Sequence, residues 1–299
     1  MKRVSSAVCA GGTKSWCGEW AAGFAVLTAM VKKIKGINAI LMPKGTENPV
    51  TDRNLWGALT MRLTRDMAPR GAAVSDSAAY QKTGNEVHEF LSFTYFYPAG
   101  CSNGSYQAVW PWDNDFRRRF LASRMGTPLS YPQHSAAPGL LHETEFISPR
   151  ALDTGEPVFL IGYIFEKQGC TLPWKQTLDR LQLGGERGYG WGRVKLIDIA
   201  DEKGSKLFEQ NINFLERNAR PAVSLPAEEK LLAHAYAEDL PAAGGIEPLV
   251  GREWRSGREK NSYAGQYLVN NGLCFTPGSS LKKPAVFEID KFGIWKRLK

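Results

Sequence analysis

The sequence predicts an α+β protein with a largely antiparallel sheet. Two runs rich in aromatic and β-branched residues, 89–100 and 156–167, are bounded by glycine and proline and predict strands. Residues 50–67 instead repeat apolar side chains at the spacing of a helix. A glycine-rich segment, residues 183–194, connects a helix-like stretch to a strand-like one. Strands and helices therefore alternate along the chain.

The first predicted elements are a short strand at residues 36–42 and, after a turn rich in proline, glycine and asparagine, a helix over residues 50–67. Thr51 or Asp52 can cap this helix, because a short side-chain oxygen accepts a hydrogen bond from an early N–H group. Side chains three or four positions apart share one face of a helix, and here that face is apolar. It comprises Leu55, Leu59, Leu63 and Met67.

The glycine-rich segment has predicted neighbours of two kinds. Residues 173–183 place leucines at helical spacing and predict a helix, whereas residues 193–200 alternate like a strand. The order of helix, loop and strand differs from the dinucleotide-binding fingerprint, in which a strand precedes the glycines. A phosphate-binding P-loop is also excluded, since no Gly-Lys-Ser/Thr triplet closes the segment.

A C-terminal unit is predicted where proline and glycine become frequent. We divide the chain into residues 1–217, a core that includes the glycine-rich loop, and residues 218–299, an α+β extension packed on this core. In the extension, residues 227–240 predict a short helix, with His234 as a surface or packing residue rather than a ligand. Residues 272–298 predict two short strands around a turn. The residues of this stretch expected in the core are Phe287, Ile289 and Trp295.

Composition bounds the class of protein. With 299 residues, 43% of them hydrophobic, the chain can bury a core, and its net charge of +8 agrees with a polyanionic partner. The apolar stretch at residues 21–31 is too short to span a bilayer, and residues 1–12 are too weakly apolar for a secretory signal. We therefore expect a cytoplasmic protein that does not bind a membrane.

The five cysteines are scattered and odd in number, which argues against a disulfide framework. Structural zinc sites usually contain pairs of ligands about two to four residues apart. Cys9 and Cys17 are too far apart for such a pair, so buried free cysteines are the favoured interpretation. We expect no metal and no cofactor, although zinc binding by the cysteines is left open.

The glycine-rich segment combines properties that suit nucleic-acid binding. Glycine lets a ligand backbone approach the main chain closely. Arg187 and Arg193 carry forked donors for phosphate, and Tyr189 or Trp191 can stack on a base. Trp191 could equally point inward as a core anchor. The candidate RNA-binding residues of this loop are Gly184, Gly185, Arg187, Gly188, Tyr189, Gly190, Trp191, Gly192 and Arg193.

Two further candidate contacts lie outside the loop. Arg53 and Asn54 stand at the head of the first long helix, and a helix N-terminus with a nearby cation suits phosphate, although an exposed capping region is the alternative. The other candidate is the basic block Arg117–Arg119. The aromatic residues before this block can stack on bases or cover the core: Trp110, Trp112 and Phe116.

Several stretches resemble a known family. Residues 184–194, GGERGYGWGRV, follow an apolar helix and resemble the glycine-rich loop of the repeat-associated RNA-binding (RAMP) superfamily of CRISPR effector proteins. Residues 51–63, TDRNLWGALTMRL, look like the helix after the first strand of these proteins, with Trp56 in place of the usual basic residue before Gly-Ala-Leu. Residues 142–165 look like the strand pair that leads to the loop, whereas the first strand is poorly defined in residues 2–20. The resemblance implies a ferredoxin-like, RRM-like fold with antiparallel sheets.

Within the superfamily, the length of the chain and residues 251–295 look most like the type III-like subunit that caps the 5′ handle of the guide RNA. The resemblance implies a non-catalytic, RNA-binding subunit of a ribonucleoprotein complex for antiviral defence. Its partners would be the guide (CRISPR) RNA and other RAMP subunits of the effector complex, with no small-molecule substrate.

An enzyme is the competing class. Some RAMP proteins process precursor CRISPR RNA as metal-independent endoribonucleases, using a histidine or tyrosine with a lysine to drive the 2′-OH onto the neighbouring phosphate. His142 beside Glu143 is the best candidate base, and His88 and Tyr106 are the weaker options.

Two other hypotheses stay open at this point. A backbone subunit that cleaves target RNA would use a loop aspartate, for which Asp113 and Asp115 are the candidates. A glycine-rich structural or carbohydrate-binding β protein would use tryptophan and glycine as platforms and turns. The arginines inside the loop disfavour this last hypothesis.

Overall fold

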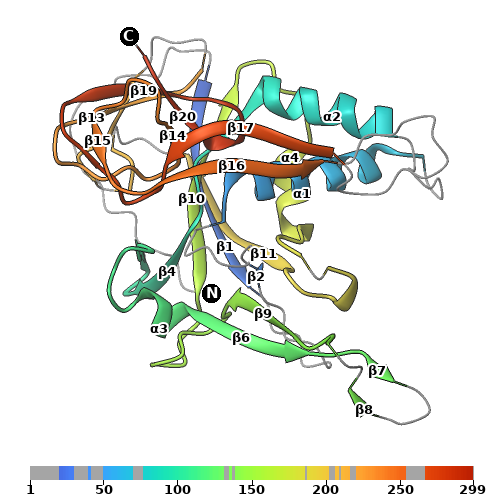
Figure 1. Cartoon of the computed structure of the whole chain (residues 1–299). Helices are drawn as coiled ribbons and strands as arrows, with labels where there is room; N and C mark the ends of the chain where they lie inside the picture. The colour runs from blue at the N-terminus through green and yellow to red at the C-terminus, as the bar shows by residue number, and fades with distance from the viewer. Residues whose placement is uncertain are drawn as a thin grey trace.

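A six-stranded antiparallel sheet forms the centre of the molecule, in the order β11-β1-β10-β4-β5, with β3 also paired to β10 (Figure 1). The structure, a computed structural model, describes residues 20–29, 40–41, 50–69, 77–130, 135–136, 139–185, 187–201, 206–208, 210–215, 220–253 and 267–298. The strands of the central sheet are β1 (Trp20–Ala29), β3 (Leu91–Phe93), β4 (Tyr97–Ser102), β5 (Ser105–Ala108), β10 (Phe159–Lys167) and β11 (Val194–Asp201).

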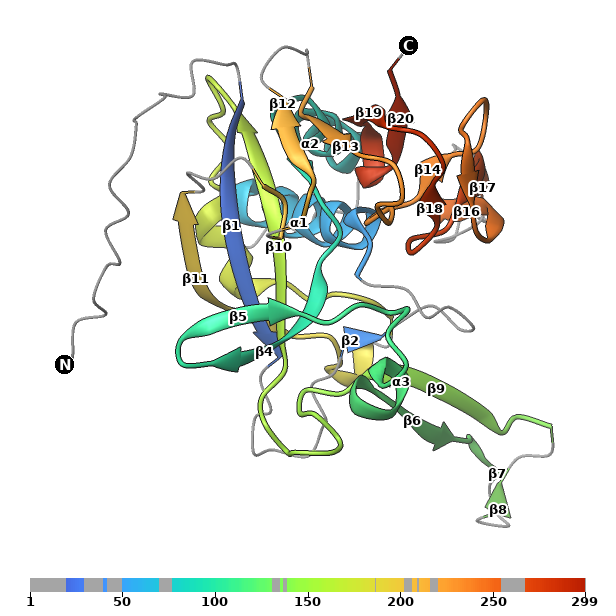
Figure 2. The same ribbon diagram turned by 90° about the vertical axis from the view of Figure 1, so that its left-hand side faces the viewer.

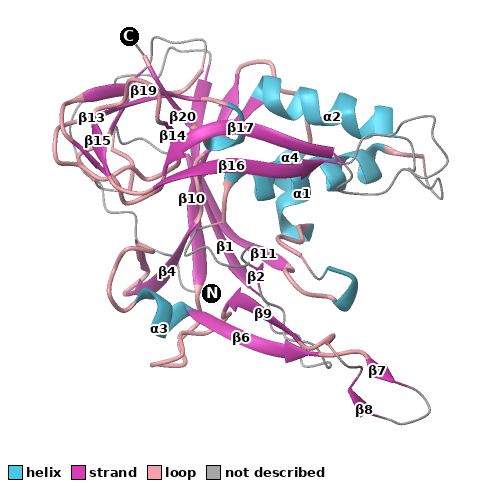
Figure 3. Ribbon diagram, viewed as in Figure 1, coloured by secondary structure: helices cyan, strands magenta, loops and turns pink. Residues whose placement is uncertain are grey.

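Helices pack on one face of this sheet (Figure 3). They are α1 (Asp52–Met67), α2 (Ser77–Phe90), α4 (Trp174–Thr177) and the 3-10 turn η1 (Leu178–Arg180). Along the chain, β1 is followed by α1 and α2, then by β3 and β4, β10, α4 and finally β11, which pairs with β1. This order is the β-α-β-β-α-β arrangement of ferredoxin-like domains. The predicted α+β class with antiparallel sheets is confirmed.

The first strand begins at the last residue of the segment in which the sequence analysis sought it. β1 begins at Trp20 and occupies most of the apolar stretch that was treated only as too short for a bilayer. Its register joins Phe24 to Tyr163 of β10 on one side and to Ala200 of β11 on the other. Pairing with β10 and β11 stabilises this strand. Its own alanine-rich sequence has low strand propensity and therefore did not predict it.

Strand β10 is buried on both faces. Leu160 and Ile164 face the helices, whereas Ile161, Tyr163 and Phe165 face the C-terminal part of the chain. Because successive side chains of a strand point to opposite faces, a strand covered on both sides becomes apolar at every position. This explains the continuous apolar run that predicted it.

The C-terminal part forms a second sheet, ordered β12-β13-β19-β20-β14-β17-β16, which packs on the central sheet. Phe287 and Trp295 of this sheet share a core with Tyr95 and Tyr97, and the Tyr97 hydroxyl donates a hydrogen bond to the carbonyl of Leu232. The strands are β12 (Asn213–Leu215), β13 (Ala222–Leu225), β14 (Ala235–Tyr236), β16 (Ile246–Glu253), β17 (Tyr267–Phe275), β19 (Ala285–Ile289) and β20 (Trp295–Arg297). A separate pair comprises β15 (Ala242–Ala243) and β18 (Ser280–Leu281).

The helix predicted over residues 227–240 is wrong. This segment contains only the short strand β14, which pairs with β17 and β20. The Trp295 N–H donates to the carbonyl of His234 over 2.8 Å, so the backbone is engaged in pairing with distant strands. His234 is a packing residue, as one of the two sequence interpretations held, because its ring is buried and lies 2.7 Å from both the Tyr95 hydroxyl and a Glu247 carboxylate oxygen.

Three predicted boundaries also shift. The helix predicted over 173–183 is regular only from Trp174 to Arg180, and the strand predicted over 89–100 is divided between the end of α2, β3 and β4. The tail contains β18, β19, β20 and part of β17 rather than two strands.

Within α1 the predicted apolar face is buried except for Met67, which is 47% exposed. The predicted core residues Phe287, Ile289 and Trp295 are buried.

An arm projects from the body of the molecule (Figure 2). It consists of the antiparallel pair β6 (Leu121–Gly126) and β9 (His142–Ile147), with a tip formed by β7 (Leu129–Ser130) and β8 (Ser135–Ala136). The two-residue strand β2 (Ile40–Leu41) pairs with β9, and the helix α3 (Phe116–Phe120) leads into β6.

Among the helices of the described part of the chain, none is both long and apolar enough to cross a membrane. Cys101 is exposed, Cys170 is half-buried and Cys274 is buried, all three as free thiols. Cys9 and Cys17, the residues considered for zinc, lie outside the described residues.

A stack of aromatic rings joins α1 and α2 to the C-terminal segment. The rings of Trp56 and His88 are parallel within 13° with centroids 4.7 Å apart, and Phe292 meets the His88 ring edge-on at 4.9 Å. Burial, together with the nearby cations Lys291 and Arg220, lowers the pKa of His88 to about 3. His88 is therefore neutral at physiological pH and serves as a packing ring.

We expect the protein to lose stability on mild acidification. An unfolded histidine has a pKa of about 6.5, so below that pH the unfolded state binds a proton that folded His88 resists down to about pH 3. The free energy of unfolding should fall with pH in this window, by at most about 1.4 kcal/mol per pH unit from this group. His88→Phe keeps the stacked ring and removes the titration. Urea unfolding from pH 4 to 7 should give a shallower pH dependence for the variant, and parallel curves would contradict this role.

Candidate nucleic-acid interface

The glycine-rich loop is closed at its base by backbone pairing. The Leu183 N–H donates to the Gly192 carbonyl over 2.8 Å, and the Val194 N–H donates to the Leu181 carbonyl over 3.2 Å. The Gln182 side-chain amide donates to the carbonyls of Arg187 and Trp191, at 3.3 and 3.2 Å. These bonds fix the turn at its base and across its middle, so a segment rich in glycine is held in a defined shape.

The glycines of the loop differ in whether the fold requires a residue without a side chain. Gly184, Gly190 and Gly192 adopt positive φ angles, which side chains disfavour, and a Cβ at Gly192 would overlap the Leu183 carbonyl oxygen. Gly188 has no such conformation, and a Cβ there would meet only open space. Gly185 is exposed. The fold therefore requires Gly192, whereas nothing in the described structure requires Gly188.

The two aromatic residues of the loop have opposite positions. Trp191 is only 6% exposed and meets Phe146 of the arm edge-on, with ring centroids 5.1 Å apart. Tyr189, in the 3-10 turn η2 (Arg187–Tyr189), is 79% exposed. Trp191 is thus the inward anchor that the sequence analysis left as an alternative, and its buried ring does not offer a stacking face. Tyr189 is the ring of this pair that an unpaired base could reach.

The cations of the loop lie at the surface, and one of them contacts α1. Arg187 and Arg193 are exposed, and Arg187 Nη1 lies 3.4 Å from the Met61 sulfur. The Arg187 side chain consequently joins the loop to the middle of α1.

Arg53 and Asn54 are separated from the loop by about two helical turns. Asn54 and Met61 are seven positions apart and share one face of α1, with an axial separation of about 10 Å. Arg53 is directed to the C-terminal segment, where its guanidinium lies 5.0 Å from the Phe292 ring centroid and a Cβ at Gly251 would overlap it. The structure thus aligns Asn54 with the loop and places Arg53 against another part of the protein.

Trp56 joins α1 to α2. Its indole N–H donates to the Gly84 carbonyl over 3.0 Å, and a Cβ at Gly84 would lie 2.8 Å from the indole ring. This side chain therefore packs between the two helices.

The basic block of α3 is neutralised by neighbouring carboxylates. Its ion pairs are Arg117–Glu145 at 3.3 Å, Arg118–Asp115 at 3.1 Å and Arg119–Asp153 at 2.9 Å. The aromatic residues before the block cover the core instead of standing free. Trp110 and Trp112 stack on each other with centroids 5.3 Å apart, and Phe116 is fully buried.

Each candidate catalytic residue makes contacts within its own part of the fold. His142 Nδ1 lies 3.2 Å from the Leu140 carbonyl at the end of β9 nearest the tip of the arm, and the Tyr106 ring packs edge-on against Phe159. Asp113 accepts a hydrogen bond from the Trp110 N–H, and His88 is enclosed in its ring stack.

Comparisons with known proteins give distant structural likenesses. No protein-family model matches the chain, and no curated protein matches it in sequence. The chain is similar to a chain in the cryo-EM structure of the Type III-B Cmr-beta bound to cognate target RNA and AMPPnP, state 1, with a TM-score of 0.44 and 10% identity over 87% of this chain and 86% of that one.

Two other solved structures show a similar degree of likeness. The cryo-EM structure of the Type III-B Cmr-beta bound to cognate target RNA gives a TM-score of 0.41 and 10% identity over 87% of this chain and 86% of that one. A crystal structure of a CRISPR protein from Archaeoglobus fulgidus gives 0.35 and 12% identity over 89% and 94% of the two chains. Because these TM-scores are low, we infer function from the residues of this chain.

The sequence analysis missed a set of arginines near the loop. Arg62 and Arg65 lie on the C-terminal half of α1, and Arg180 lies in η1 immediately before the base of the loop. The spacing of Arg62 and Arg65 on a predicted helix could have indicated that they are neighbours. The proximity of Arg62 to Arg180, more than a hundred positions away, follows only from the contact that Asp66 of α1 makes with Arg180 of η1.

We expect two glycine substitutions in the loop to affect stability very differently. Gly192→Ala forces a side chain into a positive-φ position and against the Leu183 carbonyl, and should lower the free energy of unfolding by about 1–3 kcal/mol. Gly188→Ala should change it by less than about 0.5 kcal/mol, because the site is open. Urea unfolding monitored by tryptophan fluorescence measures both values. Equal losses would mean that the loop is not held as described.

Proposed function

We propose that this chain is a non-catalytic subunit of a CRISPR ribonucleoprotein effector complex that binds the single-stranded 5′ handle of the guide RNA through the glycine-rich loop. The observation that carries the proposal is the geometry of this loop. Trp191 and Gln182 fix the turn from inside, while Tyr189 is 79% exposed and is flanked by exposed Arg187 and Arg193.

Each exposed group has a distinct task in this proposal. The Tyr189 ring stacks on an unpaired base, which is worth about 1–3 kcal/mol per base. Arg187 and Arg193 neutralise phosphates with forked donors. Gly188, which the fold does not require, lets the RNA backbone approach the turn closely.

The location of the loop also fits the way in which the sheet is covered. In RRM domains, aromatic side chains on the open face of the sheet stack on bases. Here the corresponding aromatic face, with Tyr97, Tyr163 and Phe165, is buried under the C-terminal sheet. RNA binding on this fold must therefore use an edge or a loop, and the glycine-rich loop has the required chemistry.

Exposed apolar side chains support assembly with other protein subunits. Large apolar residues that remain exposed on one surface often mark protein interfaces. Leu152 is one residue more than half exposed that lies elsewhere, but most gather on the arm and on the β16–β17 pair. On those two surfaces they are Met125, Leu129, Leu140, Leu141, Ile246, Val250, Leu268 and Leu273. We propose that neighbouring RAMP subunits cover these surfaces, and that residues 218–299 act as an extension docked on the core of residues 1–217.

The proposal is tested by the binding of a fluorescent single-stranded RNA that carries a CRISPR repeat 5′ handle, measured across a salt series. Arg187→Ala/Arg193→Ala should bind more weakly and lower the slope of log affinity against log salt by about 1.4, because each phosphate contact on a single strand contributes about 0.7. Tyr189→Ala should weaken binding by about 5- to 150-fold with little change of slope.

The matched control is Lys282→Ala/Lys283→Ala, which removes the same charge from exposed positions of the C-terminal segment. It should leave the affinity close to that of the wild type. Equal losses in both double variants would indicate nonspecific attraction and contradict the proposed site. A denaturing gel of the same samples should show intact RNA, and shortened RNA would favour the endoribonuclease hypothesis, with His142→Ala as the next variant.

A further inference from the structure

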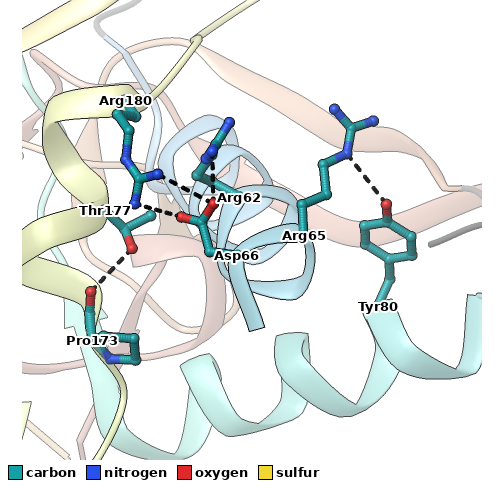
Figure 4. Close-up of polar contacts among 7 residues, drawn as sticks. All are labelled: Arg62, Arg65, Asp66, Tyr80, Pro173, Thr177 and Arg180. Carbon is teal, nitrogen blue, oxygen red and sulfur yellow. Dashed lines mark hydrogen bonds and ion pairs between the residues drawn. The ribbon is translucent and has the colours of Figure 1, made fainter. Parts of the chain in front are cut away.

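Three arginine side chains lie near one another along α1, between η1 and α2 (Figure 4). Asp66 is the acceptor between two of them, Arg62 and Arg180. Its carboxylate lies 2.6 Å from Arg62 Nη2 and 2.8 Å from Arg180 Nη2, with a second contact of 3.4 Å to Arg180 Nη1. The third member, Arg65, donates from Nε to the Tyr80 hydroxyl of α2 over 3.5 Å.

The cluster has excess positive charge and is open to solvent. Arg180 is 50% exposed and Arg62 is 33% exposed, whereas the Asp66 side chain between them is only 18% exposed. Arg65 is also exposed, and Figure 4 shows the guanidinium groups of Arg62 and Arg65 extending from the same side of α1. The carboxylate is thus less exposed than the two cations that it holds, and both of these side chains remain partly accessible to solvent.

The cluster continues the surface of the loop. Arg62 follows Met61, the residue that Arg187 contacts, and Arg180 precedes Leu181, whose carbonyl closes the base of the loop. Four residues, about 6 Å along the helix axis, separate Met61 from Arg65 on α1. The cluster therefore begins close to the point at which Arg187 contacts α1.

We propose that Arg62, Arg65 and Arg180 form a second phosphate-binding site for the same RNA strand, and that Asp66 is the positioning residue that holds two of these arginines in place. This inference rests on the proposed function. A guanidinium has five donors in a fixed fork, so an arginine that gives one edge to a carboxylate retains donors for a phosphate oxygen. Exposed ion pairs add little to stability, and stability alone therefore does not explain two arginines on one carboxylate with a third arginine beside them.

The role of Asp66 can be tested by asking whether RNA binding becomes tighter or weaker when its negative charge is removed. Asp66→Asn removes a negative charge next to the binding surface, so simple electrostatics predicts tighter RNA binding. If Asp66 positions Arg62 and Arg180, the same substitution releases both guanidinium groups and weakens binding. We expect about 3- to 10-fold weaker binding for Asp66→Asn. The control Glu86→Gln, on α2, neutralises a carboxylate outside the cluster and should leave the affinity unchanged or slightly higher.

The phosphate site is tested by the salt series with the handle RNA and Arg62→Gln/Arg65→Gln/Arg180→Gln. The slope should fall by about 2, since three contacts at about 0.7 each are removed. Lys282→Gln/Lys283→Gln/Lys296→Gln removes the same charge from exposed positions and should retain the wild-type slope. Shortening the RNA in single-nucleotide steps should abolish the effect of the cluster variant before it abolishes that of the loop variant.

Arg65→Gln serves as the second variant in case the triple variant fails to fold. It leaves both ion pairs of Asp66 intact and should still lower the slope by about 0.7. If the loop variant loses affinity while Arg65→Gln and the triple variant keep the wild-type slope, the second site is overturned and the proposed function stands. If the wild-type protein itself does not bind the RNA, the proposed function fails and this inference with it.

Discussion

The burial of β10 on both faces is the constraint on which the rest of the structure depends. Helices α1, α2 and α4 cover Leu160 and Ile164, and the C-terminal sheet covers Tyr163 and Phe165. An antiparallel sheet often keeps one face in contact with water, but here neither face of the central strand is available to a ligand. Any surface that binds RNA must therefore be built from loops and helix sides at the edge of the sheet.

The glycine-rich loop, the surface proposed to bind RNA, is fixed from its interior. A run of glycines has high conformational entropy in the unfolded chain, and ordering it has to be offset by contacts. Trp191 supplies burial against Phe146, and Gln182 ties two carbonyls of the turn together. The residues between these anchors, Arg187 and Tyr189, can then be exposed without the loop losing its shape.

The C-terminal segment packs against the start of α1. Phe292 packs against Trp56 and His88 and also lies under the Arg53 guanidinium, so the first turn of the helix belongs to the junction between the two parts of the chain. The later turns carry Met61, Arg62 and Arg65 and lie against the loop and η1. One helix thus divides its length between holding the protein together and forming the candidate RNA surface.

Local sequence determined the elements whose pattern is independent of partners. Leu55, Leu59 and Leu63 predicted the buried face of α1, the apolar run predicted β10, and the alternating residues after the loop predicted β11. The same periodicity failed at residues 227–240, where pairing with β17 and β20 overrides helical spacing. Residue types also indicated the loop as a binding site, but not which of its two rings faces solvent.

Only the tertiary structure decided that Trp191 is an anchor, that Arg53 is turned to the C-terminal segment, and that Asp66 joins Arg62 to Arg180. Each of these depends on contacts between residues far apart in the chain, and the free energy of such contacts comes from burial and packing rather than from local preference. The sequence by itself determined the chemistry available to this protein, and the packing of distant segments determined which of those groups reach the surface together.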